Sequence, residues 1–474
     1  MEREPRFTLM AIFIVALFVR AAIGMVSSGR GEMWGLERGY EEGAYALAAG
    51  YGIVRPRDDQ PRQVDLVAVA DSLARRGVRL SPSNAPRIDR TRWRPATLHP
   101  PGYSLFLFGL YRTLGPPATR WARIIQAIAD AASAVLIFFV GRRLAGRRAG
   151  LIAAFGSALF LPLAYLSTSK VADALTPPLL VLAFALYLRG FDPGRRVAWW
   201  VLSGVVMGAL ALLRPDYGAL AAFFIVSALI VSRRRRALLA PSAAMILATS
   251  LVLLPWAIRN QRAIGRLSPG TTAAGLVLLQ GVGQFPNPYG ILVNDGWYWR
   301  EAQRHGYDGV DDPGADRLLR GEFLTVARER PGLVAGDAMR RLMIALVPPY
   351  HWGFDNRFYE GHGFYDYRDS EGLGPLAALR RHPLEILRAY WDRFLFVPVS
   401  LVLLAACVIA FAIAGPRRRT AFLMLLPWAY GVIVHLPLYM TVRMMVPGVF
   451  AQMIALGCVI ARRREGVNPL RPIG

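Results

Sequence analysis

Long apolar runs, each near the length that crosses a bilayer, most limit what this chain can fold into. A helix rises 1.5 Å per residue, so the hydrocarbon core requires about 20 apolar residues. Ten segments meet or approach this length: Phe7–Val26, Trp121–Gly141, Ala149–Leu166, Val171–Leu188, Val197–Leu213, Tyr217–Val231, Leu238–Ile258, Phe394–Ala414, Phe422–Met440 and Met444–Ile460. The run Tyr103–Leu114 is too short to span and is expected to be re-entrant or interfacial. The sequence therefore predicts an all-α polytopic membrane protein with about ten transmembrane helices.

Composition agrees with a membrane protein and excludes several other classes. Hydrophobic residues make up 54% of the 474 residues, charged residues 19%, and the mean hydropathy is +0.33. A soluble domain is nearer a quarter charged. Cys407 and Cys458 both lie in apolar runs, which excludes a disulfide framework or a cysteine-rich metal site. Arg3 and Arg6 precede an apolar run with no small-residue cleavage site, so we expect a retained first helix.

The net charge of +24 reflects topology. Nearly all basic residues are arginines, and Lys170 is the single lysine. Such an excess could attract nucleic acid, but its position argues otherwise. Arginines cluster at positions 142–148, 189–196, 233–236, 417–419 and 462–464. Ten helices place these clusters on the side of the N-terminus, which the positive-inside rule makes cytoplasmic. We therefore expect a multi-pass protein of the cell membrane with both termini in the cytoplasm, membrane lipids as partners and no nucleic acid partner.

Two long segments fall on the opposite, extracytoplasmic side. The expected organisation is a cytoplasmic N-terminus with the first helix (1–26), a first outer loop (27–120), helices two to seven (121–258), a second outer segment (259–393), helices eight to ten (394–461) and a cytoplasmic tail (462–474). Loops of this length are usually functional or independently folded. Helical periodicity recurs at Asp316–Arg330 and Gly332–Leu346, among Trp- and Tyr-rich stretches that suit a membrane interface. We expect one mixed extracytoplasmic region formed by both segments.

The first outer segment begins with an acidic motif. Glu41 and Glu42 precede Tyr45, and Glu41 and Tyr45 share one face of a helix because they are four residues apart. A carboxylate at the water–lipid boundary suits a general base that takes a proton from a hydroxyl group. The alternative is that both acids belong to an ordinary solvated helix.

The same segment ends with His99-Pro100-Pro101-Gly102-Tyr103. The two prolines hold the backbone extended and begin a helix. They place His99 at the height of lipid phosphates, where it could bind an anion. A plain turn before an interfacial helix is the alternative.

Further ionisable residues lie in short outer turns. Lys170 and Asp173 are within one turn of a membrane helix, where charges usually face a cavity or a partner, although a surface ion pair is the alternative. The outer turns also contain arginines, which the positive-inside rule makes uncommon there: Arg214, Arg259 and Arg443. Together they could bind the phosphate of an anionic lipid, whereas each alone could simply extend to the interface.

These motifs occur in the same order in a known family. The chain resembles the membrane glycosyltransferases of the GT-C fold, in particular bacterial relatives of protein O-mannosyltransferases and of lipid A aminoarabinose transferases. The resemblance rests on Glu41-Glu42 with Tyr45, His99-Pro100-Pro101-Gly102-Tyr103, Asp173-Ala174-Leu175, Arg214-Pro215, and Pro255-Trp256 with Arg259-Asn260. It covers positions 7 to 260 well and the remainder loosely.

The resemblance implies a hexosyl- or pentosyltransferase. Such enzymes take the sugar from a polyprenyl-phosphate-linked donor to a lipid, glycan or protein acceptor, with inversion if the first acid is the base. The implied roles are catalytic for Glu41, Glu42 and Asp173, phosphate binding for His99, Arg443, Arg259 and Lys170, and cavity lining for Tyr45, Tyr103, Arg214 and Asp295. No cofactor and no metal ligand is indicated, although a divalent cation stays possible.

Three departures from the family pattern bear on these roles. Glu41 stands where aspartate is commoner, and His99 stands where lysine or arginine is usual, so its charge depends on pH. Ala44 occupies a position that is arginine in some relatives. Phosphate binding must therefore draw on other groups.

Two other functions share this general architecture. A flippase or transporter of lipid-linked saccharides would require charges within several helices and internal repeats, but no repeat is evident and the spans carry few charges, among them Arg20, Arg123, Asp130 and His435. A polymerase or ligase of lipid-linked glycans would differ mainly in using a longer donor. Because the polar residues concentrate on one side, the sequence favours an enzyme.

Overall fold

The computed structural model describes residues 6–26, 34–56, 64–115, 118–192, 194, 196–233, 235–350, 367 and 370–465. These residues are predominantly helical, as expected. The helices of the apolar bundle are α1 (Arg6–Val26), α5 (Ala118–Leu159), α6 (Leu161–Thr168), α7 (Thr176–Arg189), α8 (Arg196–Leu213), α9 (Leu220–Val231), α10 (Leu239–Ile264), α17 (Pro383–Ala412), α18 (Arg418–His435) and α19 (Val449–Glu465).

The long segments contribute the remaining elements. The first contains α2 (Trp34–Ala48), β1 (Val54–Pro56), α3 (Leu66–Arg75), β2 (Trp93–Pro95) and α4 (Gly102–Leu114). The second contains α11 (Ala274–Gly283), α12 (Asp295–Arg304), α13 (Pro313–Glu329), α14 (Pro331–Leu346) and α16 (Pro375–Arg381). Strands β1 and β2 pair antiparallel with Val54 opposite Pro95. The predicted helices at Asp316–Arg330 and Gly332–Leu346 are confirmed as α13 and α14.

A glycine hairpin divides α5 into two arms. Gly146 has φ 87° and ψ 173°, a conformation outside the helical region that glycine adopts readily. A Cβ atom on Gly141 would lie 2.8 Å from the Cα atom of Gly150, whereas these residues would be about 13.5 Å apart in a straight helix. The chain therefore reverses at Gly146. The first arm corresponds to the predicted span Trp121–Gly141, and the second to the first part of the predicted span Ala149–Leu166, which is broken at Phe160 and continues in α6.

The described residues contain seven helices long and apolar enough to cross a membrane: Arg6–Val26, Trp121–Leu159, Ala172–Arg189, Arg196–Leu213, Arg235–Ile264, Phe394–Ala412 and Val442–Arg462. Six correspond to one predicted span each, and Trp121–Leu159 contains both arms of the α5 hairpin. The segments corresponding to α9 and α18 are not among the seven. The chain is a multi-pass membrane protein, and its predicted total of ten spans stays a prediction.

Two charges within the bundle form a structural pair. The guanidinium of Arg20 in α1 lies 2.8 Å from the carboxylate of Asp130 in α5, and both side chains are fully buried. Arg20 also donates to the backbone carbonyl of Ser157 at 3.2 Å. Because partners surround both charges, this pair joins α1 to both arms of α5 and does not form a path through the membrane.

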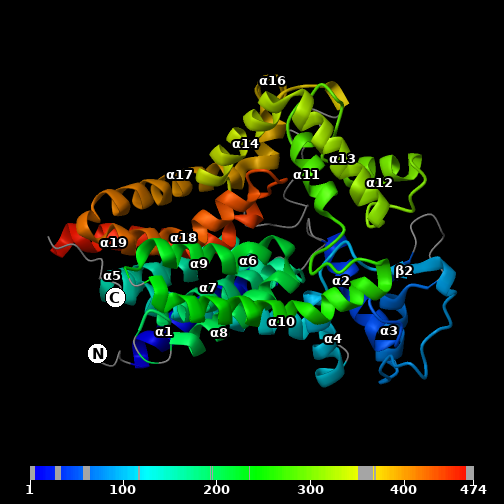
Figure 1. Ribbon diagram of the computed structural model, residues 1–474, viewed down its shortest axis with the longest axis horizontal. Helices are drawn as coiled ribbons and strands as arrows, with labels where there is room; N and C mark the ends of the chain where they lie inside the picture. The colour runs from blue at the N-terminus through cyan, green and yellow to red at the C-terminus, as the bar shows by residue number, and fades with distance from the viewer. Residues whose placement is uncertain are drawn as a thin grey trace.

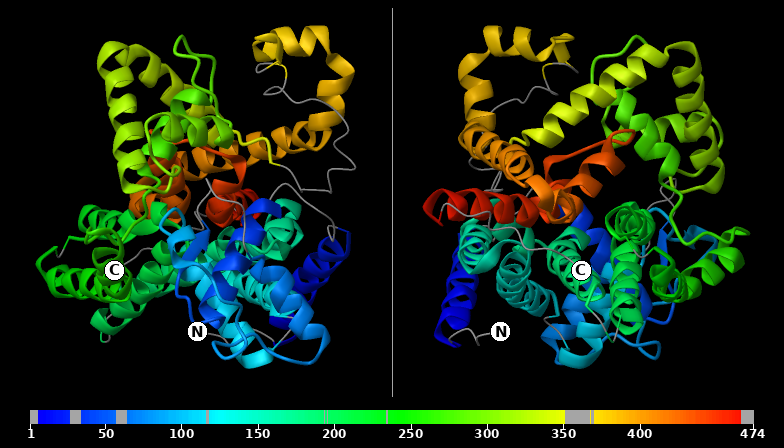
Figure 2. Two further views of the ribbon diagram at one scale, coloured as in Figure 1. Left: turned by 90° about the vertical axis from the view of Figure 1, so that its right-hand side faces the viewer. Right: turned by 60° about the vertical axis from the view of Figure 1, so that its left-hand side comes forward.

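The two long segments meet at one end of the bundle, away from both chain termini (Figure 1). In the turned views α11 to α14 lie above the bundle, and α17 rises along one side to α16 (Figure 2). This arrangement matches the single mixed region expected from the sequence.

Buried polar contacts lock the first long segment to the second. The Asp311 carboxylate, whose side chain is fully buried, lies 2.6 Å from the Arg94 guanidinium of β2 and 3.4 Å from that of Arg55 in β1. Both guanidinium groups also lie over the ring of Trp299 in α12, Arg55 at 5.1 Å and Arg94 at 5.8 Å from the ring centre. The Thr97 hydroxyl donates to the Asp311 carbonyl at 3.0 Å. Helix α12 is thereby held against the small sheet.

Cysteine labelling tests the predicted orientation. Ser83 is exposed in the first long segment and Arg236 is exposed between α9 and α10. We expect Ser83→Cys to react with a membrane-impermeant maleimide in intact cells, and Arg236→Cys to react only after permeabilisation. The native Cys407 and Cys458 are buried and supply a low background. The reverse labelling pattern would contradict the orientation inferred from the arginine clusters.

Candidate functional site

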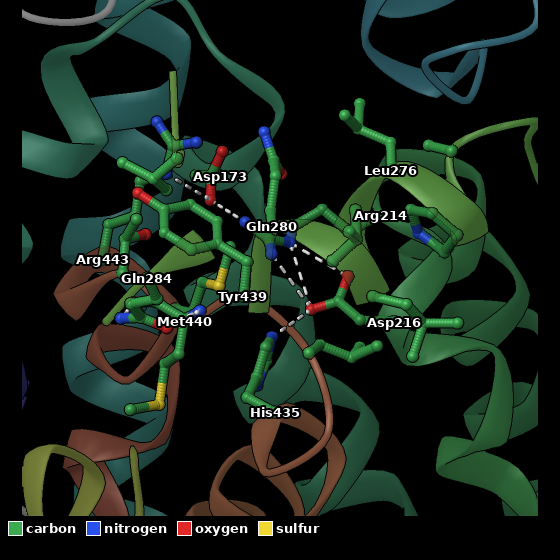
Figure 3. A pocket seen from close by; sticks show the side chains of 18 of the residues that line it. Asp173, Arg214, Asp216, Leu276, Gln280, Gln284, His435, Tyr439, Met440 and Arg443 are labelled. Carbon is green, nitrogen blue, oxygen red and sulfur yellow. Dashed lines mark hydrogen bonds and ion pairs between the residues drawn. The ribbon is translucent and has the colours of Figure 1, made fainter. Parts of the chain in front are cut away.

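A cavity of about 1490 Å³ lies between the helix ends of the bundle and the second long segment (Figure 3). Its wall combines the turns before α7 and α9, the turn between α18 and α19, helices α11 and α12, and the residues just before α4. Most small-molecule sites enclose roughly 300–1,000 Å³. This cavity is therefore larger than a typical small-molecule site.

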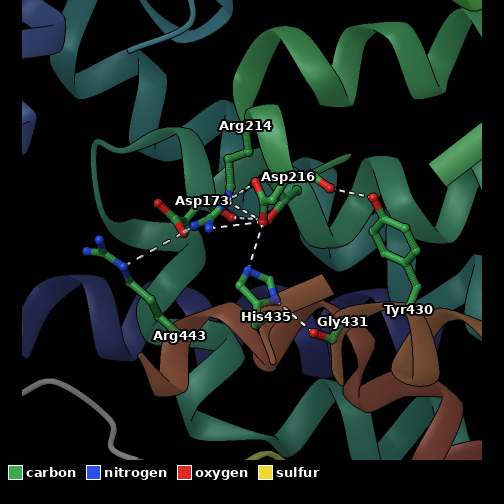
Figure 4. Close-up of polar contacts among 8 residues, drawn as sticks. Asp173, Arg214, Asp216, Tyr430, Gly431, His435 and Arg443 are labelled. Carbon is green, nitrogen blue, oxygen red and sulfur yellow. Dashed lines mark hydrogen bonds and ion pairs between the residues drawn. The ribbon is translucent and has the colours of Figure 1, made fainter. Parts of the chain in front are cut away.

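Arg214 is the centre of the polar wall (Figure 4). Its Nη1 donates to Asp173 Oδ1. Its Nε donates to Asp216 Oδ1 at 3.0 Å and its Nη2 to Asp216 Oδ2 at 3.1 Å. The guanidinium therefore donates to two carboxylates. Its two hydrogen bonds to Asp216 fix the orientation of the guanidinium plane.

Local sequence explains why Arg214 faces the cavity. Helix α8 ends at Leu213, and Pro215 begins the 3-10 turn η3 (Pro215–Ala219). A residue before proline avoids the helical region, and Arg214 is extended, with φ −145° and ψ 122°. Asp173 lies in a comparable turn, η2 (Ala172–Leu175), just before the Pro177-Pro178 start of α7. Both predicted residues line the cavity.

His435, at the end of α18, completes the network. Its Nε2 lies 3.1 Å from Asp216 Oδ2 and its Nδ1 lies 2.7 Å from the carbonyl oxygen of Gly431. Both ring nitrogens thus face oxygen atoms of neighbouring residues, which fixes the orientation of the ring. The Tyr430 hydroxyl also donates to the Asp216 carbonyl. Asp216 was not among the predicted site residues, although its place two residues after Arg214 could have suggested it.

Arg443 differs from Arg214 in its partners. It lies in η7 (Val442–Met444) and lines the cavity. Its Nε is 3.9 Å from Asp173 Oδ1, too far for a hydrogen bond, and has no hydrogen-bond partner among the described residues. With 27% of its side chain exposed, Arg443 has donors to offer an anionic ligand.

His99, for which the sequence suggests phosphate binding, lies on the cavity wall with its ring centre 5.6 Å from that of Tyr40. Its ring is open to the cavity. Loss of hydration, together with repulsion from Arg55 and Arg443, lowers its pKa to about 4. The ring is therefore neutral near pH 7 and offers a hydrogen bond there, whereas an adjoining phosphate would favour the charged form.

Glu41 lies outside the set of cavity-lining residues. Its Oε1 accepts a hydrogen bond from Lys170 Nζ at 2.7 Å, and Glu37 Oε1 accepts from the Lys170 backbone amide at 2.8 Å. Burial raises the pKa of Glu41, and Lys170 opposes that shift. Glu42 lies 3.5 Å from Arg38, which also contacts Asp65 at the start of α3. The α2 residues on the cavity wall are Leu36 and Tyr40.

Four other predicted residues lie outside the cavity wall: Lys170, which pairs with Glu41, and Tyr45, Tyr103 and Arg259. The Tyr45 ring packs edge-on against Tyr111, with centres 5.2 Å apart. The Tyr103 hydroxyl donates to Gln126 Oε1 at 2.5 Å. Arg259 donates to the carbonyls of Ala96, at 3.1 Å, and Ile53. Arg259 thus anchors the small sheet to the end of α10.

Asp295 is the remaining predicted cavity residue, and it lines the wall. Its Oδ1 accepts from Gln280 Nε2 at 2.9 Å. Gln284 and Tyr439, which were not predicted, line the same side. Among the described residues, no group of three or more His, Cys, Asp or Glu is placed to hold a metal ion.

Comparison with known proteins identifies the fold. A family model described as dolichyl-phosphate-mannose-protein mannosyltransferase matches residues 98–258, which is less than half of the chain. The structure of the oligosaccharyltransferase AglB from Archaeoglobus fulgidus, with an inhibitory peptide and a dolichol-phosphate, superposes with a TM-score of 0.51 at 13% identity, covering 96% of this chain and 50% of that one. The present chain thus spans about half the length of AglB.

Two further structures are similar over most of this chain. AglB in complex with Zn and sulfate gives a TM-score of 0.50 at 12% identity, over 96% of this chain and 49% of that one. ArnT from Cupriavidus metallidurans in the apo state gives 0.37 at 16% identity, over 95% and 76%. The search of curated proteins finds no match. The chain has the GT-C fold of membrane glycosyltransferases, as the sequence predicted.

The low pKa of His99 predicts an acid-sensitive fold. Below about pH 6.5, the ordinary histidine pKa, His99 becomes protonated in the unfolded chain. In the folded chain it becomes protonated only as the pH approaches 4, so the proton favours the unfolded state. Stability should therefore fall as pH decreases across this window. We expect the melting temperature in detergent to fall more between pH 7 and 5 for the native chain than for His99→Gln. Parallel curves would show that His99 carries no such penalty.

Proposed function

We propose that this chain is a membrane glycosyltransferase that moves a hexosyl or pentosyl group from a polyprenyl-phosphate donor to an acceptor on the extracytoplasmic face. The observation that carries the proposal is the large cavity at the helix ends, where the partly exposed Arg443 lies beside a cluster of carboxylates and its Nε has no hydrogen-bond partner among the described residues. The dolichol-phosphate and the peptide in the AglB complex support a lipid-linked donor and a separate acceptor.

Arg443 is the donor-phosphate ligand in this proposal, with His99 as its hydrogen-bonding neighbour. The other cations expected from the sequence have alternative partners: Lys170 pairs with Glu41, and Arg259 with backbone carbonyls. Arg443 is therefore the residue best able to stabilise the negative charge that develops on the departing polyprenyl phosphate.

The reaction requires a displacement at the anomeric carbon. The acceptor oxygen or nitrogen forms a bond to that carbon and loses a proton to a base. The bond between carbon and phosphate oxygen breaks, and its electron pair leaves with the polyprenyl phosphate. Attack from the face opposite the phosphate inverts the configuration. The role of base that the sequence suggests for Glu41 stays a prediction, and it would require Glu41 to leave Lys170 and enter the cavity.

A glycan ligase or polymerase is the second candidate. The cavity volume of about 1490 Å³ favours it, because such a space admits a donor larger than one sugar. The choice between these two functions also includes whether the acceptor is a lipid, a glycan or a protein. A flippase gains less support, since the Arg20–Asp130 pair is sealed within the bundle.

A transfer assay tests the proposal. Membranes with and without the active protein should differ by one glycosylated lipid, glycan or protein, and purified protein should transfer the same sugar from extracted lipid donors. Arg443→Ala should weaken undecaprenyl-phosphate binding and donor use about ten- to a hundredfold, because a charge-assisted hydrogen bond contributes about 1.5–3 kcal/mol.

The matched control is Arg419→Ala, which removes an exposed arginine at the start of α18. We expect it to retain donor binding and transfer. Unchanged glycans in membranes lacking the protein, with no transfer by the purified chain, would refute the proposed function. Full donor binding by Arg443→Ala would refute only the role of Arg443.

A further inference from the structure

Among the residues that the structure describes, Asp295 lines the cavity without a cationic partner at hydrogen-bond distance. It is the first residue of α12, and the Asn294 side chain caps the helix by accepting from the Gly296 amide at 2.8 Å. This cap fixes the turn that presents Asp295 to the cavity, where its side chain is exposed. The packing of α12 against the small sheet, through Trp299, holds the turn in place.

A single neutral donor orients the carboxylate. Gln280 in α11 is 7% exposed and donates from Nε2 to Asp295 Oδ1 at 2.9 Å. Among the described residues Asp295 has no other hydrogen bond and no ion pair. Its Oδ2 is therefore left for a ligand in the cavity.

The other acids near the cavity are neutralised by cations. Asp173 is hydrogen-bonded to Arg214, with Arg443 nearby. Asp216 bonds both Arg214 and His435, and Glu41 pairs with Lys170. A carboxylate held by a cation is a weaker proton acceptor, because protonation would break a favourable charge pair. Asp295 does not carry this penalty to the same degree.

The electrostatics of Asp295 also suit proton acceptance. Loss of hydration raises its pKa, opposed by the Gln280 hydrogen bond and by the charge of Arg443 in η7. Arg443 is the charged group that acts on it among the described residues, while α11 contributes the neutral Gln280. A raised pKa brings a carboxylate nearer to the operating pH, where general bases are most effective.

We propose that Asp295 is the general base of the transfer and that Gln280 positions it. This inference rests on the proposed glycosyltransferase function. The acceptor proton passes to Asp295 Oδ2 while the acceptor atom bonds to the anomeric carbon. The electron pair of the broken carbon–oxygen bond stays on the polyprenyl phosphate, beside Arg443. Asp295 returns the proton to water after product release.

Matched amide variants of the full-length protein test the assignment. The readouts are transfer of the sugar identified from the membrane comparison, using extracted lipid donors, and binding of undecaprenyl phosphate. We expect Asp295→Asn to lower kcat about 10²–10⁴-fold with unchanged phosphate binding and melting temperature. Asp295→Glu should restore part of the rate. Glu41→Gln should retain far more activity than Asp295→Asn.

The positioning role of Gln280 has its own readout. Gln280→Leu removes a hydrogen bond that favours the charged carboxylate, so the pKa of Asp295 should rise. The acidic limb of the kcat/KM profile should then move to higher pH, which a purely structural role would not cause. An unmoved limb would overturn the inference even if Asp295→Asn failed to fold.

The outcomes separate this inference from the function on which it rests. If Asp295→Asn stays within about threefold of the native rate while Glu41→Gln is inactive, Glu41 is the base and the glycosyltransferase stands. If both variants are active, the base lies elsewhere and the inference fails. If the native protein transfers no sugar from any extracted lipid donor, the proposed function itself fails.

Discussion

The site depends on one buried interaction, the guanidinium of Arg214 held between Asp173 and Asp216. It ties the turn before α7 to the turn after α8, and His435 adds the end of α18. These charged side chains are largely withdrawn from water, so each requires a partner. Removing one partner would leave a buried charge unpaired, which is strongly destabilising. The network therefore fixes three helix ends relative to one another and forms the polar wall of the cavity.

This pairing also decides which charges remain for a substrate. Arg214 is occupied by its two acids, whereas Arg443 keeps donors for an anion. The buried Asp311 carboxylate holds Arg94 and Arg55 of the small sheet, whose guanidinium groups lie over Trp299 of α12. Asp295, in α12, is thereby presented to the cavity with a neutral partner. Phosphate binding and proton acceptance can thus be performed by residues that line one cavity.

Helix ends were predictable from sequence, but the rotation of α2 was not. The apolar runs located the membrane helices, and the Arg-Pro and Pro-Pro turns located Arg214 and His99 at helix ends, which meet at the cavity. Adjacent residues on a helix point about 100° apart, and tertiary packing decided that Tyr40 faces the cavity while Glu41 meets Lys170. The sequence offers no local signal for that choice.

A structure of the protein with bound polyprenyl phosphate tests the central claim most directly. We expect the phosphate to lie within hydrogen-bond distance of Arg443, with the phosphate oxygen that would carry the sugar facing the α12 side of the cavity. A phosphate bound instead by Lys170 or Arg259, outside the cavity wall, would contradict the assignment of this cavity as the active site.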